Sequence, residues 1–183
     1  MNPAPNLFFI GPTGAGKSTV GARVARRLGL PFHDLDDAIR AHTGADPALI
    51  FDLEGEAGFR RRESALLAAL ATGDGLALAT GAGAVLDRAN RDLLGRRGFV
   101  VWLDADVETQ LARLGRDRQR PLLSGADLRA RLTGMAATRT PLYAALADLH
   151  ITPRATRSTD ALASDIAELV GRHWRRTPAG PPE

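Results

Sequence analysis

Short apolar runs alternate with longer helical patterns along this chain. The apolar runs are typical of buried strands, with candidates at Leu7–Ile10, Phe32–Leu35, Leu76–Ala79, Phe99–Leu103 and Leu149–Thr152. Helical patterns lie between and after them, at about 17–29, 36–43, 47–71, 88–95, 106–114, 125–147 and 159–173. This alternation predicts an α/β fold in which a parallel sheet is covered by helices on both faces.

The length and composition indicate one globular domain. The chain has 183 residues, of which 44% are hydrophobic and 25% are charged. No apolar run reaches the length of a membrane span, no signal peptide is evident, and the absence of cysteine excludes a disulfide framework. We therefore expect a cytoplasmic protein with no membrane partner.

The basic character of the chain favours a small anionic ligand over nucleic acid. The formal net charge is only +3, and the arginines are spread along the sequence. Six Phe, two Trp and one Tyr are too few for a base-stacking surface. Nucleic acid is therefore not an expected partner.

A phosphate-binding loop follows the first apolar run. The segment GPTGAGKST contains the pattern G-x-x-x-x-G-K-[ST], and its lysine is the only one among 24 lysines and arginines. Backbone N–H groups and the following helix N-terminus are expected to surround phosphates, while Lys17 reaches the β/γ-phosphates and Ser18 ligates Mg²⁺. The predicted ATP-binding residues of this loop are Gly11, Thr13, Gly14, Ala15, Gly16, Lys17, Ser18 and Thr19.

Two carboxylates end the second predicted strand. Asp34 and Asp36 form a D-x-D, and alternation would place both on one face of an extended segment. Ligands of open α/β sheets bind beyond the carboxyl ends of the strands, which places both residues near the phosphate-binding loop. One carboxylate could hold Mg²⁺ through water and the other could take a proton from a substrate hydroxyl. An alternative is that Asp36 only caps the next helix.

A guanidinium with a carboxylate partner occurs in the segment GEAGFRRRE. Arg60 and Glu63 are three residues apart, so they share a helix face. Arg60 could bind a substrate carboxylate through two N–H groups while Glu63 holds it in place. The alternative is an ordinary ion pair on a surface helix.

Three further segments suggest a binding site. Small residues at 80–84 would let a ligand approach the backbone, although glycine-rich turns are common after strands. The arginine-rich segment 113–120 lies among glycines and predicts a lid over phosphates, or else a solvated basic loop. Arg139 is expected to end a helix before Pro141, where its charge could simply favour the helix dipole.

Together these segments resemble the shikimate kinase family, within the nucleoside-monophosphate-kinase-like P-loop proteins. The matching motifs are GPTGAGKST, F-x-D-x-D, GE-x-x-FR-x-x-E, TGAGAV, RPLL and R-x-PLY, and the likeness extends from about Leu7 to Val170. It implies a three-layer α/β/α sandwich with a five-stranded parallel sheet in the order 2-3-1-4-5. It also implies a monomer that uses ATP and Mg²⁺ to phosphorylate the 3-hydroxyl of shikimate in aromatic amino acid biosynthesis.

The resemblance also assigns roles to residues. Ser18 and Asp34 would hold magnesium, Asp34 through water, and Asp36 would bind the substrate hydroxyls and act as the base. The groups that would contact shikimate are Asp36, Arg60, Gly81, Ala82, Gly83 and Arg139. Arg120 would contact the ATP phosphates and Arg113 would stack on adenine, with a second adenine contact somewhere in 153–158. The implied catalytic residues are Lys17, Asp36 and Arg120.

The resemblance further divides the chain into functional parts. A single kinase domain would cover 1–173, with a substrate-binding lobe at about 33–62 and a lid at about 113–125. The Pro- and Gly-rich end cannot form a helix, so 174–183 is predicted to be a disordered tail.

One departure from the family pattern concerns the substrate-facing turn. The family has three glycines there, whereas this chain has Ala82 in the middle, and a positive φ at that position would destabilise the turn by about 1 kcal/mol. Two alternative functions therefore stay open: a kinase for another acidic polyol such as gluconate, and a kinase-like sensor without catalysis.

Overall fold

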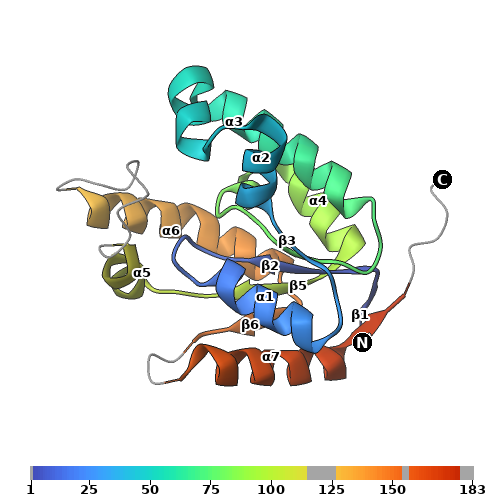
Figure 1. Ribbon diagram of the computed structural model, residues 1–183. Helices are drawn as coiled ribbons and strands as arrows, with labels where there is room; N and C mark the ends of the chain where they lie inside the picture. The colour runs from blue at the N-terminus through green and yellow to red at the C-terminus, as the bar shows by residue number, and fades with distance from the viewer. Residues whose placement is uncertain (1, 115–126, 154–156, 178–183) are drawn as a thin grey trace.

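A five-stranded parallel sheet forms the centre of the computed structural model, which describes residues 2–114, 127–153 and 157–177 (Figure 1). The strands are β2 (Asn6–Ile10), β3 (Phe32–Asp34), β4 (Ala77–Ala79), β5 (Gly98–Leu103) and β6 (Leu149–Ile151). Their order in the sheet is β3-β4-β2-β5-β6, and every neighbouring pair is parallel. The predicted fold class and strand order are thus confirmed.

Helices cover both faces of this sheet. Their bounds are α1 (Lys17–Arg27), α2 (Leu35–Thr43), α3 (Pro47–Ala71), α4 (Arg88–Arg97), α5 (Val107–Leu114), α6 (Leu128–Leu146) and α7 (Thr159–His173), with a short 3₁₀ helix η1 (Ala84–Leu86). Figure 1 shows α7 beside α1, while α3, α4 and α6 gather on the opposite side of the sheet. Each helix lies where the apolar periodicity predicts one, and only η1 was not expected.

Alternation along the central strand divides the core into two halves. Leu7 and Phe9 of β2 belong to the hydrophobic cluster under α1 and α7, whereas Phe8 and Ile10 belong to the cluster under α2, α3, α4 and α6. All four side chains are fully buried. A strand packed on both faces must be apolar at every position, which explains the unbroken apolar runs.

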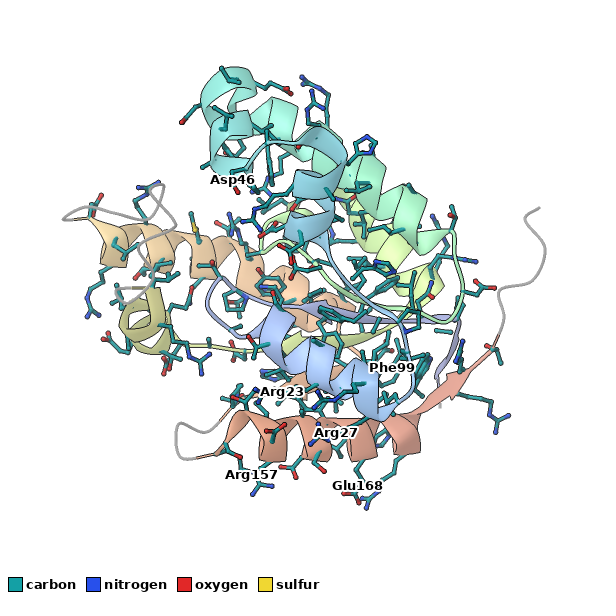
Figure 2. All side chains as sticks on the ribbon, in the orientation of Figure 1. Arg23, Arg27, Asp46, Phe99, Arg157 and Glu168 are labelled. Atoms are coloured by element: carbon teal, nitrogen blue, oxygen red, sulfur yellow. The ribbon has the colours of Figure 1, made fainter. Side chains whose placement is uncertain are left out.

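The two ends of the chain form a second, two-stranded sheet. β1 (Asn2–Ala4) pairs in parallel with β7 (Trp174–Arg176), and the Trp174 indole N–H donates a hydrogen bond to the Ala4 carbonyl oxygen at 2.9 Å. The Trp174 ring lies 6.5 Å from that of Phe99, which Figure 2 labels. The predicted tail therefore starts too early at residue 174, because one apolar residue followed by two arginines gives no strand pattern. Residues 178–183 lie outside the described part of the chain.

The interface between α1 and α7 carries ion pairs at its edge. Figure 2 shows Arg23 and Arg27 on the side of α1 that faces α7, where both lie near Asp160 at 3.5 Å and 3.6 Å. The Asp160 carboxylate is mostly exposed, so these pairs contribute little to stability. The apolar cluster beneath them holds the two helices together.

Two helices differ from expectation in their interiors. Helix α6 continues through Pro141 to Leu146, so Arg139 lies inside the helix and not at its end. Burial of Tyr143, together with packing of Leu142 and Leu146, stabilises the turn after the proline in spite of the missing N–H. Helix α3 contains a break at Gly55 (φ 68°, ψ 178°), which separates its first part from the helix that carries Arg60.

None of the helices in the described ranges is long and apolar enough to cross a membrane.

Candidate active site

The phosphate-binding loop has the backbone shape that its glycines allow. Gly11 has φ 138° and Gly16 has φ 95°, and a Cβ on Gly11 would overlap the carbonyl oxygen of Leu103. Gly16 is the N-cap of α1, so the helix dipole is directed at the loop. The Lys17 ammonium donates to the carbonyl oxygens of Gly11 (2.8 Å) and Pro12 (2.9 Å), which holds it across the loop.

One pocket brings most of the predicted phosphate-binding loop together with the predicted substrate residues Asp36, Gly81 and Ala82, whereas Arg60, Gly83 and Arg139 do not line it. It lies beyond the carboxyl ends of β2, β3 and β4, and the residues that line it are Thr13, Gly14, Gly16, Lys17, Ser18, Thr19, Asp34, Asp36, Thr80, Gly81 and Ala82. Ala15 is buried in the core and Gly11 packs against β5, so these two residues anchor the loop and do not line the pocket. The strand ends therefore bring Lys17, Asp36 and the turn after β4 to the same pocket. The residues of this turn, Gly81, Ala82 and Gly83, are called the acceptor turn below.

Asp34 caps helix α2 and contacts the phosphate-binding loop at the same time. Its Oδ1 accepts from the backbone N–H groups of Asp36 (2.9 Å) and Asp37 (3.3 Å), and its Oδ2 accepts from the Ser18 hydroxyl. The alternative in which Asp36 is the cap is wrong. Asp36 occupies the first turn of α2, so the expected extended D-x-D geometry is also wrong, yet both carboxylates line the pocket.

Ser18 and Asp34 suit a magnesium ion. Their side-chain oxygens are in contact, and oxygen is the ligand that this hard cation prefers. The described residues hold no group of three or more His, Cys, Asp or Glu that could bind a metal alone. Because Mg²⁺ commonly takes only one or two protein oxygens beside substrate phosphates and water, this pair is sufficient.

Arg60 is held by carboxylates and aromatic rings. Its Nη1 donates to Glu63 Oε2 at 2.6 Å, and Glu56 Oε1 lies 3.4 Å from Nη2. The guanidinium carbon is 5.3 Å from the Phe59 ring centroid and 5.9 Å from that of Phe51. Since the Glu63 carboxylate is buried, this is not the solvated surface pair of the alternative interpretation.

Glu63 is a buried acid beneath the acceptor turn. Burial raises its pKa, and the nearby Arg60 guanidinium, by its charge and hydrogen bond, offsets only part of that shift. Its Oε1 has no hydrogen-bond partner among the described residues and lies against Gly81, where any Cβ would overlap it. Glu63 therefore fixes both Arg60 and the position of the turn.

The surroundings of the acceptor turn favour glycine at positions 81 and 83 but not at position 82. A Cβ on Gly81 would overlap Glu63, and a Cβ on Gly83 would overlap the Arg60 guanidinium. Ala82 lies between them, lines the pocket and is partly exposed. No non-glycine residue of the described chain has positive φ, so the expected backbone strain at Ala82 does not occur.

Arg139 and Tyr143 close the site from helix α6. Both line a small cavity beside the pocket, together with Pro12 and Thr13 of the phosphate-binding loop. Burial raises the pKa of both Tyr143 and Glu63, and the charge of the nearby Arg139 offsets part of each shift. The two predicted carboxylate-binding arginines thus approach the acceptor turn from α3 and α6.

Arg113, at the end of α5, contacts the phosphate-binding loop. Its Nη1 donates to the Gly14 carbonyl oxygen at 2.7 Å. The remaining lid residues up to 125, including Arg120, lie outside the described residues, as do 154–156 of the predicted adenine loop. Their roles stay predictions.

Tyr143 has no predicted role, although its hydroxyl donates to the Ala82 carbonyl oxygen at 2.6 Å. It is the only tyrosine of the chain and follows Arg139 by four residues, which places both on one helix face. That spacing was the available signal.

Comparison with known proteins identifies the family. A family model described as shikimate kinase matches residues 13–170. The shikimate kinase of Xanthomonas euvesicatoria pv. vesicatoria (strain 85-10) is 48% identical over 181 residues, covering 98% of this chain and 100% of that protein. The chain belongs to the shikimate kinase family.

Further relatives agree with this membership. The shikimate kinase of Stenotrophomonas maltophilia (strain K279a) is 47% identical over 96% of this chain and 97% of its own length. The solved shikimate kinase from Acinetobacter baumannii in complex with shikimate has a TM-score of 0.87 at 41% identity, covering 92% of this chain and 94% of that one. The predicted activity is thus confirmed: the chain is an ATP-dependent small-molecule kinase that phosphorylates shikimate in aromatic amino acid biosynthesis. This membership decides against the gluconate and sensor alternatives.

Proposed function

We propose that ATP and shikimate meet in the single pocket between the phosphate-binding loop and the acceptor turn, where the γ-phosphoryl group passes to the 3-hydroxyl. The observation that carries this proposal is the shared lining of that pocket, to which Lys17, Asp36, Gly81 and Ala82 all contribute. Donor and acceptor groups held in one pocket need little further ordering to react.

The nucleotide side consists of the loop, Lys17 and the magnesium-binding pair. Backbone N–H groups of the loop and the α1 N-terminus attract the phosphates, and Lys17 neutralises charge on the β- and γ-phosphates. Ser18 and Asp34 would hold Mg²⁺, which neutralises charge on the transferring group. Arg113 would stack on adenine, and Arg120 would add a positive charge at the phosphates.

The acceptor side combines two cations with one carboxylate. Arg60 and Arg139 would bind the carboxylate of shikimate from two helices, while Asp36 binds its hydroxyls. The hydroxyl oxygen forms the new bond to the γ-phosphorus as the bond from that phosphorus to the ADP oxygen breaks. The hydroxyl proton passes to Asp36, so the step is balanced without a further reactant.

We further propose that the enzyme is a cytoplasmic monomer, because the described chain completes the pocket by itself and the sequence contains no cysteine. Light scattering during size-exclusion chromatography should give the mass of one chain, 19.4 kDa. A dimer at assay concentrations would contradict this part.

An assay of ADP release with Mg²⁺ and shikimate, with gluconate and with no acceptor tests the proposed reaction. We expect release with shikimate only, phosphate on the 3-hydroxyl by phosphorus–proton NMR correlation, and no turnover by Lys17→Met. Near-normal turnover of Lys17→Met, or phosphate on another hydroxyl, would contradict the proposal.

A further inference from the structure

Tyr143 joins two parts of the acceptor side that come from different elements. Its side chain is buried on α6, and its hydroxyl donates to the Ala82 carbonyl oxygen in the turn after β4. Arg139, one helical turn earlier on α6, lines the same small cavity as Tyr143. The phenolic oxygen therefore ties the acceptor turn to the helix that carries an arginine of the proposed carboxylate site.

The direction of the Tyr143–Ala82 hydrogen bond is fixed by chemistry. A carbonyl oxygen can only accept, so the Tyr143 hydroxyl donates to Ala82. Burial raises the pKa of Tyr143, which keeps its donor proton in place across the neutral range. A phenylalanine could not make this bond.

Packing alone does not explain the hydroxyl. The Tyr143 ring belongs to the apolar cluster on the helix-rich face and lies 5.9 Å from the Trp102 ring, contacts that phenylalanine would keep. A buried hydroxyl is favourable only when it is hydrogen-bonded, and this one is bonded to the backbone of the turn. The flanking glycines lie against Glu63 and Arg60 of α3, while Ala82 accepts from Tyr143 of α6, so both helices contact the same turn.

We propose that Tyr143 is a positioning residue for the acceptor substrate. Its hydroxyl fixes the distance between the Gly81–Gly83 turn and the helix that carries Arg139. Shikimate can then place its carboxylate at Arg139 and its reacting hydroxyl at Asp36 at the same time. This inference rests on the proposed function, because it takes Arg139 as a carboxylate ligand. Tyr143 itself touches neither reacting atom.

The first test is Tyr143→Phe, which removes the oxygen and keeps the ring. We expect the KM for shikimate to rise by about tenfold, as for one lost hydrogen bond in a binding site, with a much smaller change in the KM for ATP. An unchanged KM for shikimate, or equal changes in both KM values, would overturn the inference.

Trp174→Phe is the matched control for a loss of stability. It also removes one buried hydrogen bond to an alanine carbonyl oxygen, at 2.9 Å from Ala4, but at the small terminal sheet. We expect a lower unfolding temperature with both KM values unchanged. If this control raised the KM for shikimate as Tyr143→Phe does, general loosening would explain both and the inference would fail.

A double-mutant cycle with Arg139→Gln tests whether Tyr143 influences shikimate binding through Arg139. If Tyr143 acts largely through Arg139, Tyr143→Phe should reduce kcat/KM for shikimate by less than about threefold in the Arg139→Gln background. If the effects of the two substitutions on kcat/KM were fully additive, the inference would be contradicted, even though the wild-type enzyme phosphorylated shikimate. Failure of the wild-type enzyme to phosphorylate shikimate would instead reject the proposed function.

Discussion

The middle residue of the acceptor turn is the position where this chain departs from the glycine pattern of its family. A Cβ at Gly81 would displace the buried Glu63 carboxylate and one at Gly83 would displace the end of the Arg60 side chain, whereas nothing in the backbone conformation demands glycine at Ala82. The Ala82 methyl group occupies part of the pocket wall on the acceptor side. Its effect should therefore fall on the fit of shikimate and not on folding.

Replacement of Ala82 separates an effect on the binding of shikimate from an effect on folding. We expect Ala82→Gly to leave kcat/KM for shikimate equal or up to about threefold higher, because it removes one methyl group from the acceptor side. Gly81→Ala is the matched control, since its Cβ would overlap Glu63, and it should lower kcat/KM by more than tenfold. A large loss in Ala82→Gly would show that the methyl group itself contributes to binding.

The buried acid at Glu63 predicts how stability depends on pH. Its pKa is raised in the folded state, so the folded protein retains this proton to a higher pH than the unfolded chain does. The contribution of Glu63 to the free energy of unfolding therefore falls as the pH rises from about 4.5 to the folded-state pKa.

Glu63→Gln removes this dependence. Chemical denaturation from pH 4.5 to 7.5 should show the free energy of unfolding of the variant rising relative to wild type as the pH increases. Its KM for shikimate should also rise, because Arg60 loses its 2.6 Å partner. A constant stability difference across this range would contradict the pKa direction.

At the level of elements, local sequence determined most helices and strands, and tertiary contacts determined the exceptions. The run Val100–Leu103 is apolar throughout and is a strand, and Asp34 is a strong cap in a recognisable position. By contrast, Pro141 predicts a helix end that the packing of Tyr143 overrides. The short strand β7 is fixed by its pairing with β1 and by the buried Trp174, tertiary contacts that no local pattern reveals.

The break in α3 gives a direct test of backbone strain. Gly55 has φ 68° and ψ 178°, a conformation that only glycine adopts readily, with open space around its Cα. Gly55→Ala should lower the free energy of unfolding by about 1–3 kcal/mol. Gly134→Ala, inside α6 and equally open, should raise it by about 0.5–1 kcal/mol. Equal effects in urea denaturation would contradict the strained geometry.

The terminal sheet makes a prediction about truncation. Removal of 178–183 keeps β7 and its pairing with β1, so it should leave the unfolding temperature within about 1 °C of wild type. Removal of 174–183 also deletes the buried Trp174 and its hydrogen bond, which should cost about 3 kcal/mol or more. Calorimetry that gave the same temperature for both truncations would contradict a structural role for β7.

At the scale of the whole molecule, a parallel sheet brings distant motifs to one edge. The loop after β2, the carboxylates after β3 and the turn after β4 meet there, because these strands are neighbours and run in one direction. Sequence motifs were sufficient to predict this meeting. They did not reveal the role of Tyr143, because its four-residue spacing from Arg139 does not indicate that its hydroxyl donates to a backbone carbonyl oxygen in a distant turn.

The most direct test of the shared pocket is a crystal structure of the enzyme with Mg²⁺, shikimate and a non-hydrolysable ATP analogue. We predict the shikimate carboxylate on Arg60 and Arg139, its 3-hydroxyl at Asp36, and that oxygen about 3–3.5 Å from the γ-phosphorus beside Lys17. Shikimate bound away from these four side chains, or turned so that another hydroxyl faced the γ-phosphate, would contradict it.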